Sequence, residues 1–168
     1  AGVTSAIGLT RDSFSGRGVS AIIGAGCSRA SETAAQTVSA VQVPIVSPTA
    51  QSPALSNALT YPYFLRVIPS SDFDGVATVD LILHLFNYTS CAVVSSLEAY
   101  GIGAASGFNR AAVSAGLQVV TTPFFQAGAI NFEDQIDQLR RSGARVIVLL
   151  CLAGDGANFL SAAYDDDI

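Results

Sequence analysis

Few residues of this chain could take part in catalysis. The only histidine, His84, shares a predicted helix face with Asp80 one turn earlier, which is typical of a solvated surface. All basic residues are Arg, so Schiff-base and phosphate-binding lysines are excluded. Paired carboxylates are abundant only at Asp165–Asp167, which we interpret as a solvated end. The residues therefore predict no catalytic centre, no metal site and no cofactor, and we expect a protein that is not an enzyme.

Binding chemistry is possible at Gly24–Ser28, which follows an apolar strand and begins a helix. The start of a helix presents free backbone N–H groups and the positive end of the helix dipole, and both attract anions. Ser28 adds a hydroxyl at this point. The segment thus predicts a site for a carboxylate or another anion, with a plain tight turn capped by Ser28 as the alternative.

A second glycine-rich segment, residues 100–107, also follows a predicted strand and begins a helix. It is similar to a dinucleotide-binding motif, but its third glycine is displaced by one position. The next strand ends in Thr121 and Thr122, where that motif expects an acid. We interpret Gly101 and Gly103 as positions where another group approaches the backbone closely, beside an exposed Tyr100.

Short β-branched runs alternate with helical stretches along the chain, which predicts an α/β fold with parallel sheets. Ligands of such sheets bind beyond the carboxyl ends of the strands. We expect strands at 19–24, 44–47, 63–68, 91–95, 117–122 and 146–151, helices at 28–42, 71–86, 102–115, 131–141 and 154–164, and loops at 49–60 and 123–129. The apolar strand 146–151 suggests burial on both faces.

Several details of the helices are also predicted. Ser71 and Asp74 have the spacing of a capping box. Gly116 is a good helix end, and Asp137 and Arg141 are one turn apart. One apolar stripe of the 71–86 helix is expected to consist of Val76, Val79, Ile82, Leu83 and Phe86.

The composition excludes several classes of protein. Half of the 168 residues are hydrophobic and 12% are charged, so the chain has enough apolar surface to fold. The net charge of −5 disfavours nucleic acid as a partner. No apolar run reaches the roughly 18–20 residues that span a bilayer. The chain contains no Met and starts without a leader-like segment, so we interpret it as a fragment or an excised piece.

The three cysteines cannot all pair within the chain. Cys91 and Cys151 lie in apolar stretches, and we expect them to be buried thiols that pack as small hydrophobic side chains. Cys27 lies in a glycine-rich turn and is expected to be accessible.

Four segments in this order resemble the receptor-family ligand-binding region. This is the type I periplasmic-binding-protein-like ectodomain of class C G-protein-coupled receptors, receptor guanylyl cyclases and ionotropic glutamate receptors. The segments are VSAIIGAGCS at 19–28, VPIVSPTAQSPALSN at 43–57, the run from YPYFLRVIPSSD to CAVVSS at 61–96, and EAYG at 98–101. The resemblance implies two Rossmann-like lobes with parallel sheets, with residues 1–68 as part of lobe one and 69–168 as part of lobe two.

The resemblance also implies which residues bind a ligand. Ser28 matches the serine that holds the carboxylate of an amino-acid ligand, and Thr49 matches a small hydroxyl residue. Tyr100, with Gly101 beside it, matches the tyrosine that lines the cleft from lobe two. Gln51 stands where glutamate-binding members have a threonine, so the implied ligand is an amino acid or a similar small carboxylate rather than glutamate in particular.

Two further features fit an extracellular receptor. Cys27 matches a cysteine of the guanylyl-cyclase receptors whose partner lies upstream, and Asn87-Tyr88-Thr89 is an N-glycosylation sequon. We therefore expect the extracellular sensing module of a membrane receptor, a homo- or heterodimer at full length, which signals when its lobes close on a small ligand. The alternative is a soluble periplasmic binding protein for an amino acid, which shares the fold.

Overall fold

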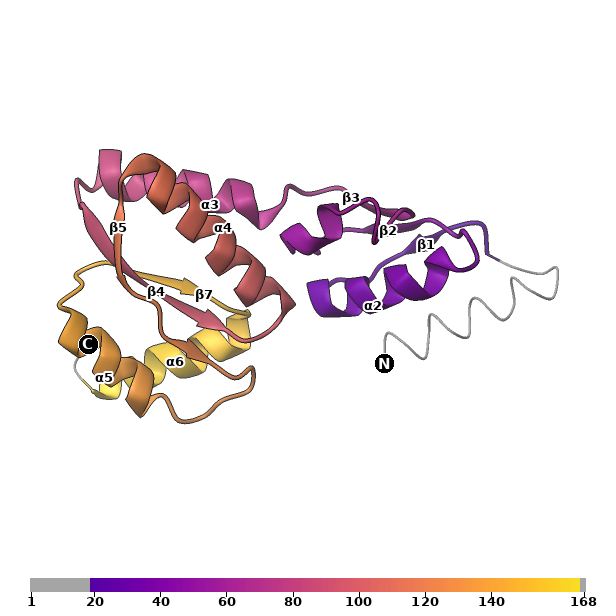
Figure 1. The fold of residues 1–168 in the computed structure, drawn as a ribbon. Helices are drawn as coiled ribbons and strands as arrows, with labels where there is room; N and C mark the ends of the chain where they lie inside the picture. Colours follow the sequence, from indigo (N-terminus) through magenta and orange to yellow (C-terminus); the bar gives the residue numbers. More distant parts are fainter. Residues whose placement is uncertain (1–18, 167–168) are drawn as a thin grey trace. The chain divides into compact units, whose positions relative to one another are not determined.

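The computed structural model describes residues 19–166, which divide into two compact units, residues 19–70 and 71–166 (Figure 1). Both units alternate helices with parallel strands, so the expected α/β class with parallel sheets is confirmed. The division falls after Ser70, two residues beyond the boundary expected from the sequence. The assignment of the two units to the two lobes stays a prediction.

The first unit contains a small parallel sheet with the strand order β1-β2-β3. One face of this sheet is covered by α2, whose Ala35 and Val38 are buried with Ile45 of β2. The sheet is shorter than the sequence predicts, because β1 includes only the last part of the apolar run at 19–24. The elements are β1 (Ile22–Ile23), α2 (Ser28–Ser39), β2 (Ile45–Ser47), the short helix η2 (Pro53–Ser56) and β3 (Phe64–Arg66).

The second unit is built around one central strand, β4 (Ser90–Ser96), which pairs in parallel with three others. Alternate side chains of β4 enter two separate cores. Cys91 and Val93 pack with α3 and α4, and Ala92 and Val94 pack with α5 and α6. The other elements are α3 (Ser71–Asp80), η3 (Leu81–Leu85), α4 (Ala99–Ala115), β5 (Gln118–Thr121), β6 (Phe124–Phe125), α5 (Glu133–Ser142), β7 (Ile147–Leu150) and α6 (Ala153–Asp165).

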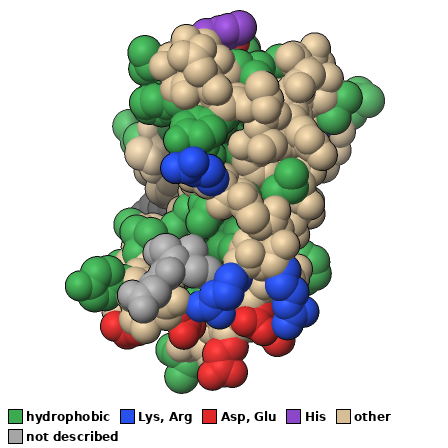
Figure 2. Space-filling view, turned by 90° about the vertical axis from the view of Figure 1, so that its left-hand side faces the viewer, with side chains coloured by type: hydrophobic (Ala, Val, Ile, Leu, Met, Phe, Trp, Pro, Cys, Tyr) green, Lys and Arg blue, Asp and Glu red, His purple; other side chains and the backbone are tan. Residues whose placement is uncertain are grey.

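Helices therefore cover both faces of the second sheet, which explains why the middle of β4, residues 91–94, is apolar. On one side α3 and α4 pack closely, and an Arg110–Asp72 ion pair with an N–O distance of 2.5 Å joins them. On the other side the outer surface of α5 carries mixed charges (Figure 2). Its Asp137 pairs with Arg141 at 2.9 Å, as the spacing predicts.

The helix predicted at 71–86 differs from the expectation in two ways. Ser71 is the first helical residue rather than the residue before the helix. Its buried hydroxyl has no hydrogen-bond partner among the described residues. The predicted capping box of Ser71 and Asp74 is therefore wrong. The last turn, η3, is a π-helix in which the Phe86 N–H donates to the Leu81 carbonyl. This wider turn rotates the following residues away from α-helical spacing.

The predicted apolar stripe is only partly buried. Val79 and Ile82 belong to the core, and Leu83 packs against it. Val76 and Phe86 are 52% and 58% exposed, so the expectation for these two residues is wrong.

Other boundaries also shift. β6 lies in the stretch expected to be a loop, and η2 interrupts the predicted 49–60 loop. β7 is partly exposed rather than fully buried, because its first residue, Ile147, is 37% exposed. Gly116 ends α4 in the left-handed conformation, as predicted. All three thiols are free: Cys91 is buried and Cys27 exposed, as expected, whereas Cys151 is only half-buried.

Candidate functional site

In the first unit, the loops that follow β1 and β2 are bound to each other by side-chain hydroxyls. The Ser47 hydroxyl donates to the Ala25 carbonyl at 2.6 Å, and the Thr49 hydroxyl donates to the Gly26 carbonyl at 2.5 Å. Ser31 of α2 donates to the same Ala25 carbonyl at 3.0 Å. These bonds fix the turn that begins α2 at the carboxyl end of the sheet, where ligands of parallel sheets bind.

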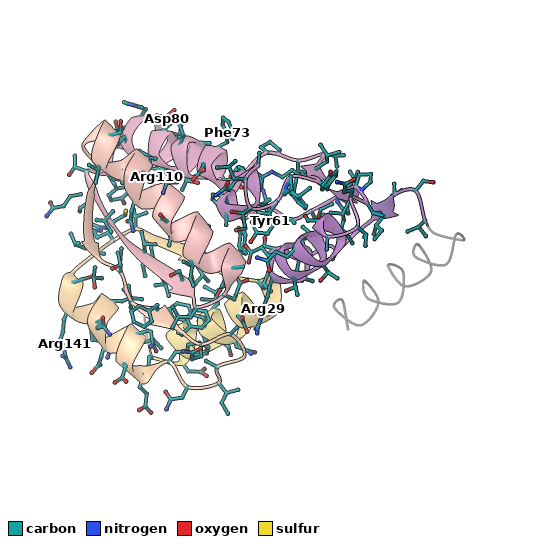
Figure 3. All side chains as sticks on the ribbon, turned by 45° about the vertical axis from the view of Figure 1, so that its right-hand side comes forward. Arg29, Tyr61, Phe73, Asp80, Arg110 and Arg141 are labelled. Carbon is teal, nitrogen blue, oxygen red and sulfur yellow. The ribbon has the colours of Figure 1, made fainter. Side chains whose placement is uncertain are left out.

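Ser28 lies at the start of α2 and is 3% exposed. Its Oγ accepts a hydrogen bond from the Ser52 N–H at 3.0 Å. No side chain of the preceding residue, Cys27, caps the helix. The first N–H groups of α2 therefore keep the donor capacity and the positive dipole end that favour an anion, and Arg29 adds a positive charge at an exposed position of the same turn (Figure 3).

The structure brings the other predicted residues of this unit to the same loops. Cys27 and Thr49 are exposed, and Gln51 is half-buried. The arrangement offers one anion-binding helix start flanked by small polar side chains. Contact of any of these residues with a ligand stays a prediction.

In the second unit, Glu98 occupies the start of α4. Its carboxylate accepts hydrogen bonds from the Tyr100 N–H at 2.9 Å and the Gly101 N–H at 2.7 Å, and the Ser96 hydroxyl is 3.2 Å away. The chain thus supplies its own anion to this helix start. The sequence analysis missed Glu98 because it placed the helix start at residue 102. The available signal was the position of Glu98, two residues before Tyr100 and three before Gly101, from which a carboxylate can accept hydrogen bonds from the first N–H groups of a helix.

Tyr100 is half-buried rather than exposed as expected, and it lies near several acidic groups. Burial raises the pKa of its phenol, and the charges of Asp74 and Glu98 raise it further. Burial also raises the pKa of the Cys151 thiol, with a further contribution from Asp155. The ordinary pKa of a phenol already lies well above neutral pH and the shift is upward, so the Tyr100 hydroxyl is protonated and can donate a hydrogen bond in a negative environment.

Gly101 is buried, and the group that approaches it closely belongs to the protein itself. A Cβ atom at this position would overlap the Ser96 carbonyl oxygen and lie 2.5 Å from the Ser96 hydroxyl. The glycine is therefore required by packing between β4 and α4. Packing alone explains why residue 101 is a glycine, and the predicted contact of Gly101 with a ligand stays a prediction.

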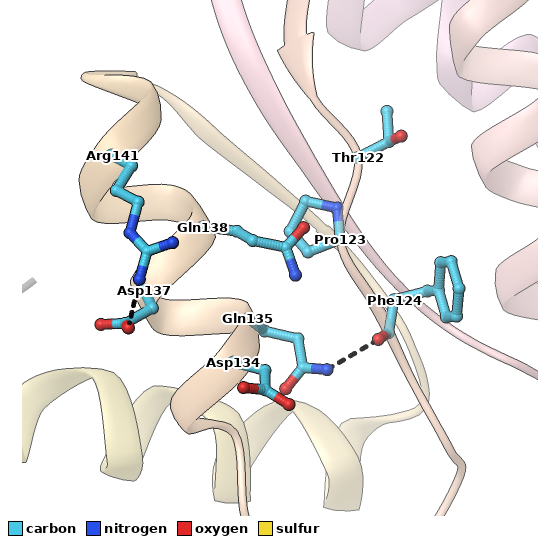
Figure 4. Close-up of a pocket in the computed structure, with 8 residues that line it drawn as sticks. All are labelled: Thr122, Pro123, Phe124, Asp134, Gln135, Asp137, Gln138 and Arg141. Carbon is cyan, nitrogen blue, oxygen red and sulfur yellow. Dashed lines mark hydrogen bonds and ion pairs between the residues drawn. The ribbon is translucent and has the colours of Figure 1, made fainter.

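A separate pocket of about 310 Å³ lies beside α5 (Figure 4). Two pairs of its polar groups are joined: the Gln135 amide donates to the Phe124 carbonyl at 2.9 Å, and Arg141 pairs with Asp137 at 2.9 Å. The Phe124 ring points away from the helix (Figure 4). Thr122, Asp134 and Gln138 complete its polar lining, and none of the residues predicted to bind a ligand lies in it.

The remaining sequence candidates lie on the surface of the second unit. Asn87 is exposed and has a positive φ of 57° between η3 and β4. His84 and Asp80 are both exposed, as their shared face predicts. Within residues 19–166, no three His, Cys, Asp or Glu side chains are placed to hold a metal ion. None of the helices described is long and apolar enough to cross a bilayer.

Comparison with known proteins gives consistent matches. Residues 3–168 match the family model described as "Receptor family ligand binding region". The "Probable metabotropic glutamate receptor mgl-1" of Caenorhabditis elegans is 26% identical over 140 residues, which are 79% of this chain and 14% of that protein. The human "Taste receptor type 1 member 1" is 31% identical over 135 residues, which are 78% of this chain and 16% of that protein.

A third relative, the "Metabotropic glutamate receptor" of Drosophila melanogaster, is 28% identical over 145 residues. The match includes 84% of this chain and 15% of that receptor. The chain thus spans only a small part, 14–16%, of the length of these receptors.

Proposed function

Since the chain belongs to the receptor-family ligand-binding regions, we propose that it is part of the extracellular sensing module of a cell-membrane receptor. The receptor resembles class C G-protein-coupled receptors, and its ligand is an amino acid or a similar small carboxylate. The observation that carries this proposal is the match of residues 3–168 to the family together with relatives named as metabotropic glutamate and taste receptors. These relatives favour a receptor over a soluble periplasmic binding protein.

The geometry of α2 supports a carboxylate as one recognised group. Its first turn lacks a side-chain cap, and Ser28 and the loop at Thr49 lie beside it. In the second unit, the acidic groups near Tyr100 favour a positively charged group such as an ammonium. In this proposal, closure of the receptor's two lobes on the ligand shifts a receptor dimer between resting and active arrangements.

The proposal is tested with the complete ectodomain and a calorimetric titration of the twenty proteinogenic L-amino acids. For the amino acid that binds most tightly, Ser28→Ala is expected to weaken binding by about 1–3 kcal/mol, which is roughly 5- to 150-fold, because a charged carboxylate loses a hydrogen bond. Ser39→Ala is the matched control: it removes a hydroxyl from the other end of α2 that donates only within the helix, to Ala35 at 2.7 Å.

The thermal midpoints of both variants are recorded alongside, since Ser28→Ala also removes a partner of the Ser52 N–H. Equal affinity of a folded Ser28→Ala variant would remove Ser28 from the site. Absence of binding by every amino acid of the panel would contradict the proposed ligand class.

A further inference from the structure

Ser52 connects two side chains of the first unit through its backbone. Its N–H donates to the Ser28 Oγ at 3.0 Å, and its carbonyl accepts a hydrogen bond from Arg66 Nη1 at 2.9 Å. The Ser52 hydroxyl in turn donates to the Glu32 carboxylate of α2 at 2.9 Å. The position of Ser52, and with it the bond to Ser28, is thus defined from several directions.

The bond from Ser52 decides how the Ser28 hydroxyl can be used. A hydroxyl has one hydrogen to donate and two lone pairs to accept. Ser52 occupies a lone pair of Ser28, and the hydroxyl hydrogen has no acceptor within residues 19–166. Ser28 therefore has its hydrogen available for an external acceptor such as a carboxylate oxygen.

Arg66 holds the loop that contains Ser52. It lies on β3 and is half-buried, and its guanidinium also donates to the Ala50 carbonyl at 3.4 Å and to the Ser56 hydroxyl. The planar guanidinium presents several donors in a fixed geometry, which suits it to hold several oxygens of one loop at once. Lysine has a single ammonium on a flexible stem and cannot reproduce this pattern.

We propose that Arg66 is a positioning residue for ligand binding, which fixes Ser52 so that Ser28 offers its hydroxyl hydrogen to the ligand's carboxylate. This inference rests on the proposed function, because it assumes that Ser28 contacts the ligand. Arg66 itself need not touch the ligand, and its influence passes through the Ser52 peptide group.

The test is a double-mutant cycle in the complete ectodomain, with the tightest-binding amino acid of the panel as probe. Four proteins are compared by calorimetry: wild type, Ser28→Ala, Arg66→Lys and the double variant. Arg66→Lys is expected to weaken binding roughly 3- to 10-fold in the wild-type background. In the Ser28→Ala background the same change is expected to alter affinity less than about 2-fold, since residues that act through one contact are not additive.

Two further variants keep the experiment decisive. Arg110→Lys is the control, because Arg110 and its partner Asp72 both lie in the second unit. The ligand affinity of this variant is expected to equal that of the wild-type protein. Should Arg66→Lys fail to fold, Ser56→Ala replaces it, because it removes one partner of the guanidinium at an exposed position.

The outcomes separate the two proposals. Unchanged affinity of Ser28→Ala would overturn the assumed ligand contact and with it the proposed site. A weakened Ser28→Ala combined with an additive effect of Arg66→Lys, or with no effect of it, would overturn only the positioning role of Arg66.

Discussion

At the scale of single residues, Gly101 shows how backbone packing limits the start of α4. The Ser96 carbonyl, at the end of the central strand, occupies the space of a Cβ atom at Gly101. The Gly101 N–H is also bound by Glu98 at 2.7 Å, which fixes the helix start against the strand. The Ser96 carbonyl belongs to β4, which pairs with β5, β6 and β7, so it is not free to move away from an added side chain.

Gly101→Ala is therefore expected to lower the free energy of unfolding by about 1–3 kcal/mol, the range for overpacking a buried position. Urea unfolding followed by circular dichroism measures the change. Gly154→Ala is the matched control near the start of α6, where an added Cβ meets no atom within 4 Å. The control is expected to be neutral or slightly stabilising, since Ala favours helices over Gly; a Gly101→Ala variant as stable as this control would contradict the packing argument.

At the scale of elements, three aromatic rings connect β6, α5 and α6. The rings of Phe125 and Phe132 meet edge to face at 5.1 Å, and Phe159 stacks on Phe125 at 6.0 Å. All three side chains are buried in the core on the α5 and α6 side of the sheet. These contacts fix β6, a strand of two residues that backbone pairing alone would hold weakly.

Phe159→Ala is expected to cost about 3–5 kcal/mol of stability, because it removes a buried ring and leaves a cavity. Leu160→Ala, the neighbouring residue on α6, changes a side chain that is 61% exposed and is expected to cost far less. Chemical denaturation of both variants measures the difference. A loss of similar size in both would show that the aromatic contacts do not stabilise this core.

The same elements show how far sequence patterns predict the fold. Long apolar runs and strong helix signals, such as residues 91–95 and Gly116, correspond to β4 and the end of α4. β6 was not predictable, because its two residues become a strand only by pairing with Ser95 and Ser96, far away in the sequence. The π-turn of η3 was missed as well, since side-chain spacing is read with a fixed α-helical period.

At the scale of the whole molecule, the order of strands and helices predicted the class of fold, and the comparison established the family. The sequence also named Ser28 and Thr49 as candidate ligand-binding residues, which stays a prediction; Ser28 begins α2, and Thr49 lies in the loop that is bonded to the turn before it. It could not identify the residues that orient them. The bonds from Arg66 to Ser52 and from Ser52 to Ser28 depend on tertiary contacts that no local pattern encodes.

An extracellular receptor module enters the secretory pathway, where an accessible sequon becomes a glycan acceptor. Asn87 is exposed in the turn between η3 and β4, and Thr89, the third residue of the sequon, is exposed as well. The Tyr88 N–H donates to the Ile82 carbonyl at 2.9 Å, so the turn is held while the Asn87 side chain remains accessible. We expect Asn87 to carry a glycan when the intact protein is produced in a secretory eukaryotic host.

Before treatment with an N-glycosidase, the wild-type protein is expected to migrate more slowly than Asn87→Gln, which lacks one glycan; after treatment, this difference is expected to disappear. Thr89→Ala keeps the asparagine but removes the acceptor triplet, so it is expected to behave like Asn87→Gln. Asn158→Gln is the control, since Asn158 is exposed on α6 but is not followed by the triplet. Wild-type protein whose mobility the enzyme does not change would contradict glycosylation at Asn87 and weaken the extracellular assignment, because the turn offers no steric reason for an unused site.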